Sequence, residues 1–389
     1  MIFTMAAVSF AADETVMIVS YKTMKGTFSD EYSVFHTGWT DAIKKSTDGN
    51  YKQVTVTLQK DWLSAWDGQF TPDFRNKEGF NWDAINFPSG CFITLDLNGH
   101  KIDRQLTTWE HNGEVMSIEK GANVVIKNGT ITGGFSCNGG GGIHIHGGNV
   151  TLENVVVKEN KIEDDDGVGI AMYGGTLVMN GGSLSDNDGL AYGASVFGGG
   201  IAVYKGEATL NNVTISNNYI HGGKRASNNG AAVFVSEGTV YLNECTIENN
   251  RTSAEGGALY VMSDKGKLYV DKCTITGNTA GWDGNAIYLK DGYCKITNSN
   301  IYNNVNSDGD PSVYLCWAEI ELDNCYLDDE IYNIDGKETW GTRVEEPLSL
   351  SGSMIAEDST IAIVFGAIAV VAAVVIIVVK KKKAAETEK

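Results

Sequence analysis

The chain has little proline, few cysteines and no excess of positive charge. Only 4 of its 389 residues are proline, although 46 are glycine. High glycine without proline is typical neither of collagen nor of proline-rich disordered segments. Lys and Arg number 30 against 49 Asp and Glu, which gives a formal net charge of −19. Because an acidic surface repels nucleic acid and anionic lipid, we expect no nucleic-acid partner.

The seven cysteines are an odd number and cannot form a closed disulfide framework. Cys245, Cys273 and Cys325 share one inward position of the repeat described below, where we expect small core residues. A disulfide between Cys245 and Cys273 is the alternative, because adjacent coils lie within disulfide range. The sequence also has no Walker loop, no G-x-S-x-G motif and no kinase motif set.

Apolar segments lie near both ends of the sequence. Residues 1–11 finish in small residues typical of a signal-peptidase site and are expected to be the remnant of a secretory signal. Residues 361–379 carry no charge and are long enough to span a bilayer core of about 30 Å. Residues 380–389 begin with four lysines, which stay on the cytoplasmic side. The sequence therefore predicts a single-pass, monomeric protein of a bacterial or archaeal cell surface, with its N-terminal part outside.

A pattern of the form L-x-[N/G]-x-x-I-x-x-N recurs every 26–32 residues along the middle of the chain. Self-similarity with such a period marks a solenoid. The pattern begins at Leu97, Ile126, Leu152, Met179, Leu210, Leu242, Val270, Ile296 and Leu322.

Each repeat contains three short segments in which apolar residues alternate, as Ile143 and Ile145 do. Alternation with period two predicts strands that have one inward face. Three strands per repeat favour a parallel β-helix over a leucine-rich repeat, which lacks three strands per unit, and over a propeller blade, which needs antiparallel hairpins. We expect an N-terminal cap over residues 12–50 with a short helix at Trp39–Ser46, the β-helix over residues 51–335, and a stalk over residues 336–360.

One asparagine and one glycine corner recur in each coil. Stacked asparagine side chains can hydrogen-bond from amide to carbonyl along the axis, and glycine before a strand permits a tight corner. We therefore expect a structural role for the six repeating asparagines, Asn160, Asn187, Asn218, Asn250, Asn278 and Asn304.

The motifs at Gly256–Leu259, Gly199–Ala202 and Ile247–Asn250 resemble the GGA[I/L] and FxxN repeats of polymorphic outer-membrane adhesins, with Ile or Leu in place of Phe. Ile93–Ile102 resembles the opening coil of bacterial surface β-helix proteins in the pectate-lyase-like superfamily. The resemblance covers about residues 90–335. Together with the rule that parallel crossovers are right-handed, it implies an all-β, right-handed parallel β-helix.

Two clusters could bind a metal ion. Asp164, Asp165 and Asp166 follow a ladder asparagine, and in lyases and galacturonases of the resembling superfamily paired carboxylates hold Ca²⁺ or act in acid–base catalysis. The alternative is a solvated acidic loop. His144 and His146 point outward from one strand, Glu119 is the register neighbour of His146 in the preceding coil, and the three could bind Zn²⁺. The alternative is two solvated imidazoles, and we name no catalytic residue and no required cofactor.

An aromatic stripe follows the outward positions of one predicted sheet. Such a ladder stabilises a sheet, and on an exposed sheet it also suits sugars or a partner protein. The loops add Tyr192, Phe197, Tyr219 and His221. The candidate ligand-binding residues are Tyr173, Tyr204, Phe234, Tyr260, Tyr288, Tyr314 and Trp282.

These patterns favour a membrane-anchored surface protein that binds a carbohydrate or a surface protein in adhesion. One alternative is a lyase or glycoside hydrolase that acts on an acidic polysaccharide. Another is a structural spacer of the surface layer. The sequence favours a binding protein over an enzyme.

Overall fold

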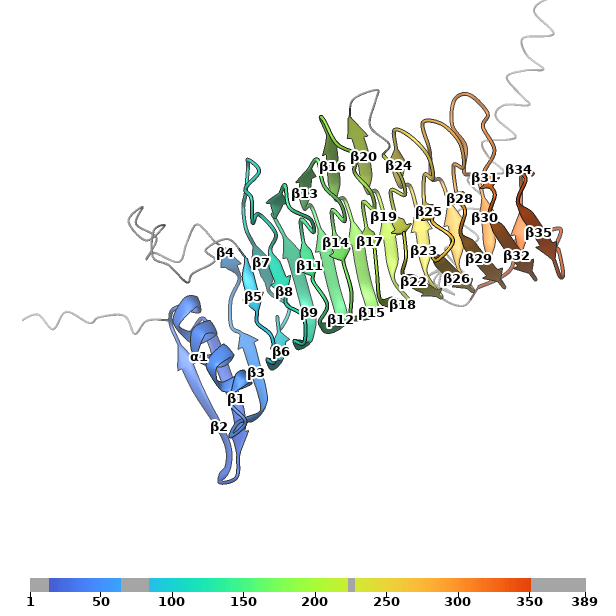
Figure 1. Ribbon diagram of the computed structural model, residues 1–389. Helices are drawn as coiled ribbons and strands as arrows, with labels where there is room; N and C mark the ends of the chain where they lie inside the picture. The colour runs from blue at the N-terminus through green and yellow to red at the C-terminus, as the bar shows by residue number, and fades with distance from the viewer. Residues whose placement is uncertain (1–13, 64–83, 223–227, 351–389) are drawn as a thin grey trace, which may run out of the picture. The chain divides into compact units, whose positions relative to one another are not determined.

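The repeats build a parallel β-solenoid of about nine turns in the computed structural model (Figure 1). The structure describes residues 14–63, 84–222 and 228–350. The predicted signal remnant, membrane-spanning segment and basic tail lie outside these residues. Within residues 14–63, 84–222 and 228–350, no helix is both long enough and apolar enough to cross a membrane.

The first predicted strand of each coil forms a ten-stranded parallel sheet. In this sheet the alternating apolar residues, such as Ile143 and Ile145, are fully buried in the main core. Its strands are β5 (Ile85–Phe87), β8 (Met116–Ile118), β11 (Ile143–Ile145), β14 (Ile170–Met172), β17 (Ile201–Val203), β21 (Val233–Val235), β25 (Leu259–Met262), β28 (Ile287–Lys290), β31 (Val313–Cys316) and β34 (Ile331–Ile334).

The second and third predicted strands form two adjacent ladders of one twenty-stranded sheet. The first ladder contains β3 (Lys52–Leu58), β6 (Phe92–Asp96), β9 (Asn123–Thr132), β12 (Asn149–Lys158), β15 (Thr176–Ser185), β18 (Glu207–Asn211), β22 (Thr239–Asn243), β26 (Lys267–Asp271), β29 (Tyr293–Thr297), β32 (Glu319–Asp323) and β35 (Lys337–Trp340). The second contains the far halves of β9, β12 and β15, with β4 (Trp62–Leu63), β7 (Lys101–Asp103), β19 (Thr214–Ser216), β23 (Thr246–Glu248), β27 (Thr274–Thr276), β30 (Asn300–Tyr302) and β33 (Tyr326–Leu327). Since β35 pairs with β32, the solenoid extends into the segment expected to be a stalk.

A fourth short strand, absent from the sequence prediction, occurs in five coils, where it follows a ladder asparagine in four and Gly134 in the fifth. It is too short to show an alternation, because its inward face has a single apolar residue in most coils, such as Ile162 or Ile220. These two side chains pack with Val168, Ala191 and Val196 in a small second core. The strands are β10 (Phe135–Ser136), β13 (Lys161–Glu163), β16 (Asp188–Ala191), β20 (Tyr219–Gly222) and β24 (Arg251–Thr252).

The six repeating asparagines form the predicted ladder, and all are buried. The side-chain oxygen of Asn218 accepts the backbone N–H of Asn187 at 3.2 Å and the side-chain Nδ2 of Asn187 at 2.9 Å. The Nδ2 of Asn218 donates to the carbonyl of Leu184 in the preceding coil at 3.0 Å. The ladder thus satisfies backbone groups at a buried corner where no strand pairs them.

The cap covers the first coil with one hairpin and one helix. Strands β1 (Met17–Thr23) and β2 (Gly26–Tyr32) form an antiparallel hairpin, and β1 also pairs antiparallel with β3. Helix α1 (Phe35–Thr47) is longer than the expected segment, and the ring of its Trp39 lies 5.1 Å from that of Phe87 on β5. An aromatic face of the helix therefore closes one end of the core.

Candidate functional site

The aromatic stripe forms one continuous row on the outer face of the ten-stranded sheet. Neighbouring rings stack with centroids 4.9–5.8 Å apart from Phe234 through Tyr260, Tyr288 and Tyr314 to Tyr332. At the other end Tyr204 contacts Phe234 and stacks on Tyr173 at 5.1 Å. Strand register brings Phe234, Tyr260, Tyr288 and Tyr314 together as the sequence spacing predicted. Tyr332, which the sequence prediction did not include, continues the row.

The expected exposure of this row is wrong at its centre. Phe234 is 0% exposed, Tyr260 2% and Tyr288 7%. These rings lie outside the main core but inside a third apolar cluster, packed against Phe197 and Tyr204. They are therefore sheet-stabilising core residues and do not form part of an open binding face.

The row is buried because the loops that enter the ten-stranded sheet fold back over it. In six coils a glycine adopts a left-handed conformation three residues before the strand, as Gly256 (φ +68) and Gly284 (φ +68) do. A Cβ on Gly256 would lie 3.0 Å from the Cβ of Tyr260, and one on Gly284 would lie 3.0 Å from that of Tyr288. The predicted glycine corner thus brings the covering loop onto the aromatic row.

Carboxylates of the covering loops accept hydrogen bonds from the tyrosine hydroxyls. Asp165 bonds Tyr173, Asp166 bonds Tyr204, and Glu255 bonds Tyr260. Burial raises the pKa of Asp166 to about 7, against the opposing effect of the Tyr204 hydrogen bond. Burial also raises the pKa of Asp165 and of Glu255. These three carboxylates are therefore already hydrogen-bonded to tyrosine side chains of the same protein.

Asp164, in the same acidic loop as Asp165 and Asp166, is hydrogen-bonded to backbone groups of the neighbouring loop. Its Oδ1 accepts the backbone N–H groups of Tyr192, Gly193 and Ala194 at 2.6, 2.9 and 3.1 Å. Burial would raise its pKa, but these three donors together lower it. The carboxylate therefore fixes the neighbouring loop, in which the Tyr192 side chain is 70% exposed.

The second candidate metal cluster is not an open pair of imidazoles. His144 is 4% exposed and its ring lies 3.9 Å from the exposed ring of His146, while Tyr173 stands 5.2 Å away on its other side. Neither ring nitrogen of His144 has a hydrogen-bond partner among the described residues. Burial, with a smaller effect of His146, lowers the pKa of His144 to about 3.

No metal centre is assembled in the described part of the chain. There, no group of three or more His, Cys, Asp or Glu side chains is arranged to hold a metal ion. Neither Asp164, Asp165 and Asp166 nor His144, His146 and Glu119 form such a group. The three aspartates instead accept hydrogen bonds from the backbone and from tyrosine hydroxyls.

Some large aromatic side chains remain exposed, in the covering loops and also at the start of β20 and just after β14. Trp282 is 50% exposed, and Tyr173 and Tyr219 are each 37% exposed. The loop of Trp282 is fixed by Asn306, whose Nδ2 donates to the Trp282 carbonyl at 3.2 Å and whose Oδ1 accepts from Gly309 at 2.9 Å. We call Tyr192, Tyr219 and Trp282 the loop face, and Tyr173 is the exposed end of the aromatic row.

A polar cluster lies beside Tyr219 on the outer side of the five-stranded sheet. The Tyr219 ring stacks on His221 at 4.4 Å, and the Arg251 guanidinium lies 5.4 Å from the same ring. His221 Nε2 is 2.9 Å from the Asp188 carboxylate. The cluster joins three coils through the register of β16, β20 and β24.

Sequence analysis did not identify Glu255, Asn306 or Arg251 as parts of this region. Glu255 precedes a glycine corner, as Asp166 does before Gly167, and that shared position was the available signal. Asn306 begins a Ser-Asp-Gly turn, a context in which asparagine commonly caps backbone N–H groups. Arg251 gave no signal, because its strand has two residues only.

All seven cysteines are free, including Cys245 and Cys273. The Sγ of Cys273 accepts the backbone N–H of Cys245 at 3.3 Å, and both side chains are buried. Together with Cys325 they are the small core residues that the repeat predicted. The alternative disulfide is not formed.

Comparison with protein families agrees with this geometry. The model of the right-handed β-helix region matches residues 93–275 and, in an overlapping match, residues 194–327. The two matches together cover more than half of the 389 residues, so the chain belongs to the right-handed β-helix family. Searches among curated proteins and among solved structures gave no match.

Proposed function

We propose that this right-handed β-helix protein binds a glycan or a partner protein at a cell surface through its loop face. The observation that carries the proposal is the way in which exposed aromatic rings are held. Three backbone hydrogen bonds to Asp164 fix the loop of Tyr192, and Asn306 fixes the loop of Trp282. Rings that are exposed and already ordered lose little conformational entropy on binding.

The proposed location rests on the sequence. Residues 361–379 form the membrane anchor of the proposal, and the four lysines after them remain inside the cell. The β-helix would then display its loop face outside, as in the adhesins whose repeats it resembles. The formal charge of −19 disfavours acidic ligands, except near Arg251, whose guanidinium lies beside the Tyr219 ring.

A glycan array with the full-length chain tests the proposal. We expect the wild type to retain at least one glycan and Tyr192→Ala/Trp282→Ala to weaken that binding at least tenfold. The matched control is Tyr241→Ala/Tyr269→Ala, which removes a stacked pair from the twenty-stranded sheet and should bind as the wild type does. If the loop-face variant bound every glycan as strongly as the wild type does, the proposal would be contradicted. If the wild type retained no glycan and cross-linking at Tyr192 captured no partner protein, the structural spacer would be the favoured function.

A polysaccharide lyase or hydrolase is the second candidate, and the cluster beside Tyr219 favours it. The contact of His221 with Asp188 resembles an acid–base pair, and Arg251 could hold a uronate carboxylate. Incubation with uronic-acid polymers tests this function. Unsaturated products or new reducing ends that disappear in His221→Ala would establish an enzyme, whereas intact polymer would exclude this candidate.

A further inference from the structure

Apart from the loop face, one exposed aromatic residue, Phe92, lies where the cap meets the first coil. Phe92 on β6 is 64% exposed, the largest exposure of any phenylalanine in the described residues. Its neighbours in the same outward column are polar, since Phe92 pairs with Asn123, which is followed by Asn149 and Thr176. An exposed ring in a polar column does not serve the core.

The backbone next to Phe92 departs from regular pairing. The register between β1 and β3 shifts between Ser20 and Lys22, so that β3 carries a bulge around Gln53. Gln53 has φ +51, a left-handed conformation that costs a residue with a side chain about 1–2 kcal/mol. Bulges of this kind are over-represented next to functional sites, where they re-aim side chains.

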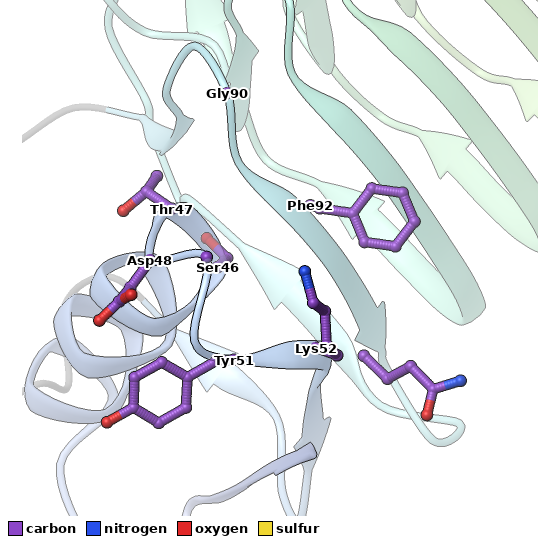
Figure 2. Close-up of a pocket in the computed structure, with 9 residues that line it drawn as sticks. Ser46, Thr47, Asp48, Tyr51, Lys52, Gly90 and Phe92 are labelled. Carbon is purple, nitrogen blue, oxygen red and sulfur yellow. The ribbon is translucent and has the colours of Figure 1, made fainter. Parts of the chain in front are cut away.

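The bulge opens a groove on each side of Phe92. Pairing of β3 with β6 begins at Val54 and Ile93, so Gln53 and Phe92 are left beside each other without a ladder contact. Each groove has a volume of about 410 Å³, and Gln53 and Phe92 line both. In Figure 2, Ser46, Thr47 and Asp48 at the end of α1 lie on one side of the first groove and Phe92 lies on the other.

The polar groups of the two grooves are mostly uncharged. The first groove has the Ser46 and Thr47 hydroxyls, with Asp48 and Lys52 as its charges. The second has the hydroxyls of Ser20, Thr27, Thr55 and Thr94, with Lys22 as its charge. Tyr51 also lines the first groove and Tyr21 the second. Aromatic rings among hydroxyl and amide groups match a sugar chain, whose units have an apolar face of C–H groups and a rim of hydroxyls.

We infer that Phe92 and its two grooves form a second binding site, for a chain of neutral sugars. One sugar unit lies on the Phe92 ring, and the neighbouring units occupy the two grooves and hydrogen-bond to Gln53 and the threonine hydroxyls. The inference rests on the proposed function in one respect, that the protein binds glycans. The Phe92 site and the loop face consist of different residues, so an experiment can exclude either one without the other.

The test uses the full-length chain and neutral tetrasaccharides of β-1,4-glucose, β-1,4-mannose and α-1,4-glucose on an array. We expect at least one to be retained and Phe92→Ala to weaken its binding at least tenfold at an unchanged melting temperature, since the ring is exposed. The matched control is Trp109→Ala, which removes a 51% exposed ring outside the grooves and should have no effect.

A second variant separates this site from the loop face. Thr94→Trp fills the second groove and should also weaken binding, whereas Tyr192→Ala/Trp282→Ala should leave neutral-sugar binding unchanged. Equal binding by wild type and Phe92→Ala, or retention of none of the three probes, would overturn the inference. If the loop-face variant alone loses binding, the proposed function stands and this second site does not exist.

Discussion

At the residue scale, the ladder asparagine determines whether the buried N–H groups at its corner have hydrogen-bond acceptors. Asn218 accepts two N–H groups of Asn187, whereas Asn160 at the start of the ladder accepts one, from Gly134 at 3.1 Å. An orphaned buried donor costs about 1–3 kcal/mol.

Asn218→Ala should therefore lower the free energy of unfolding by roughly 2–6 kcal/mol, and Asn160→Ala by about half as much. Urea titrations of the two variants check the order. Equal losses would mean that the ladder bonds do not determine the stability of the corner.

A buried carboxyl should give the protein a distinctive pH dependence. The pKa of Asp166 is raised to about 7 by burial, while an unfolded aspartate titrates near 3.9. The folded state therefore binds more protons between about pH 4 and pH 7, and its stability falls as the pH rises through this range.

Asp166→Asn should remove that fall, and its gain over the wild type should reach the order of 3 kcal/mol above pH 7. Asparagine can still accept the backbone N–H of Phe197, which Asp166 Oδ1 accepts at 2.7 Å. Unfolding measured at pH 4, 5.5 and 7.5 checks this. A gain that does not grow with pH would show that Asp166 is ionised throughout.

His144 should have the opposite effect. Burial lowers its pKa to about 3, so between about pH 3 and 6.5 the unfolded state binds the extra proton and stability is lost as the pH falls. His144→Phe extends the aromatic row and removes two unpartnered ring nitrogens. We expect it to stabilise the protein more at pH 4.5 than at pH 8. An equal effect at both pH values would exclude titration of His144 as the cause.

At the element scale, the covering loops depend on the glycine that turns them. Gly256 and Gly309 are both left-handed, at φ +68 and +77, but only a Cβ on Gly256 would meet other atoms, at 2.9 Å from the Leu259 carbonyl. The left-handed conformation alone costs alanine about 1–2 kcal/mol.

Gly309→Ala should therefore cost about 1–2 kcal/mol. Gly256→Ala should cost clearly more, because it must also move the loop off Tyr260. Thermal unfolding of both variants measures the difference. Similar losses would show that the loop yields at no cost and does not cover the row tightly.

At the scale of the whole molecule, the sequence repeat predicted the features that neighbouring coils have in common. Inward residues such as Ile143 and Ile145, the ladder of Asn218 and its equivalents, and the register of the aromatic row follow from a fixed period. These features recur in several successive coils, and a single sequence therefore contains several copies of the same evidence.

What the repeat could not predict is how loops of unequal length pack. The burial of Tyr260 depends on a loop that crosses it, and the part played by Asp164 depends on three N–H groups of the next coil. The Phe92 grooves depend on a single bulge at Gln53. The Asp164 contacts and the Gln53 bulge are local features with no second copy in the sequence, and the covering loops differ in length and residues from coil to coil.

The central claim is that the aromatic row is a second core and the loop face is the binding surface. Comparison of Tyr260→Ala with Tyr192→Ala tests it most directly, by unfolding free energy and by retention of the glycan that the wild type binds. We predict that Tyr260→Ala loses about 3–5 kcal/mol and that its folded fraction still binds. Tyr192→Ala should change stability by less than about 0.5 kcal/mol and weaken binding severalfold. Weakened binding in folded Tyr260→Ala, together with unchanged binding in Tyr192→Ala, would contradict the account.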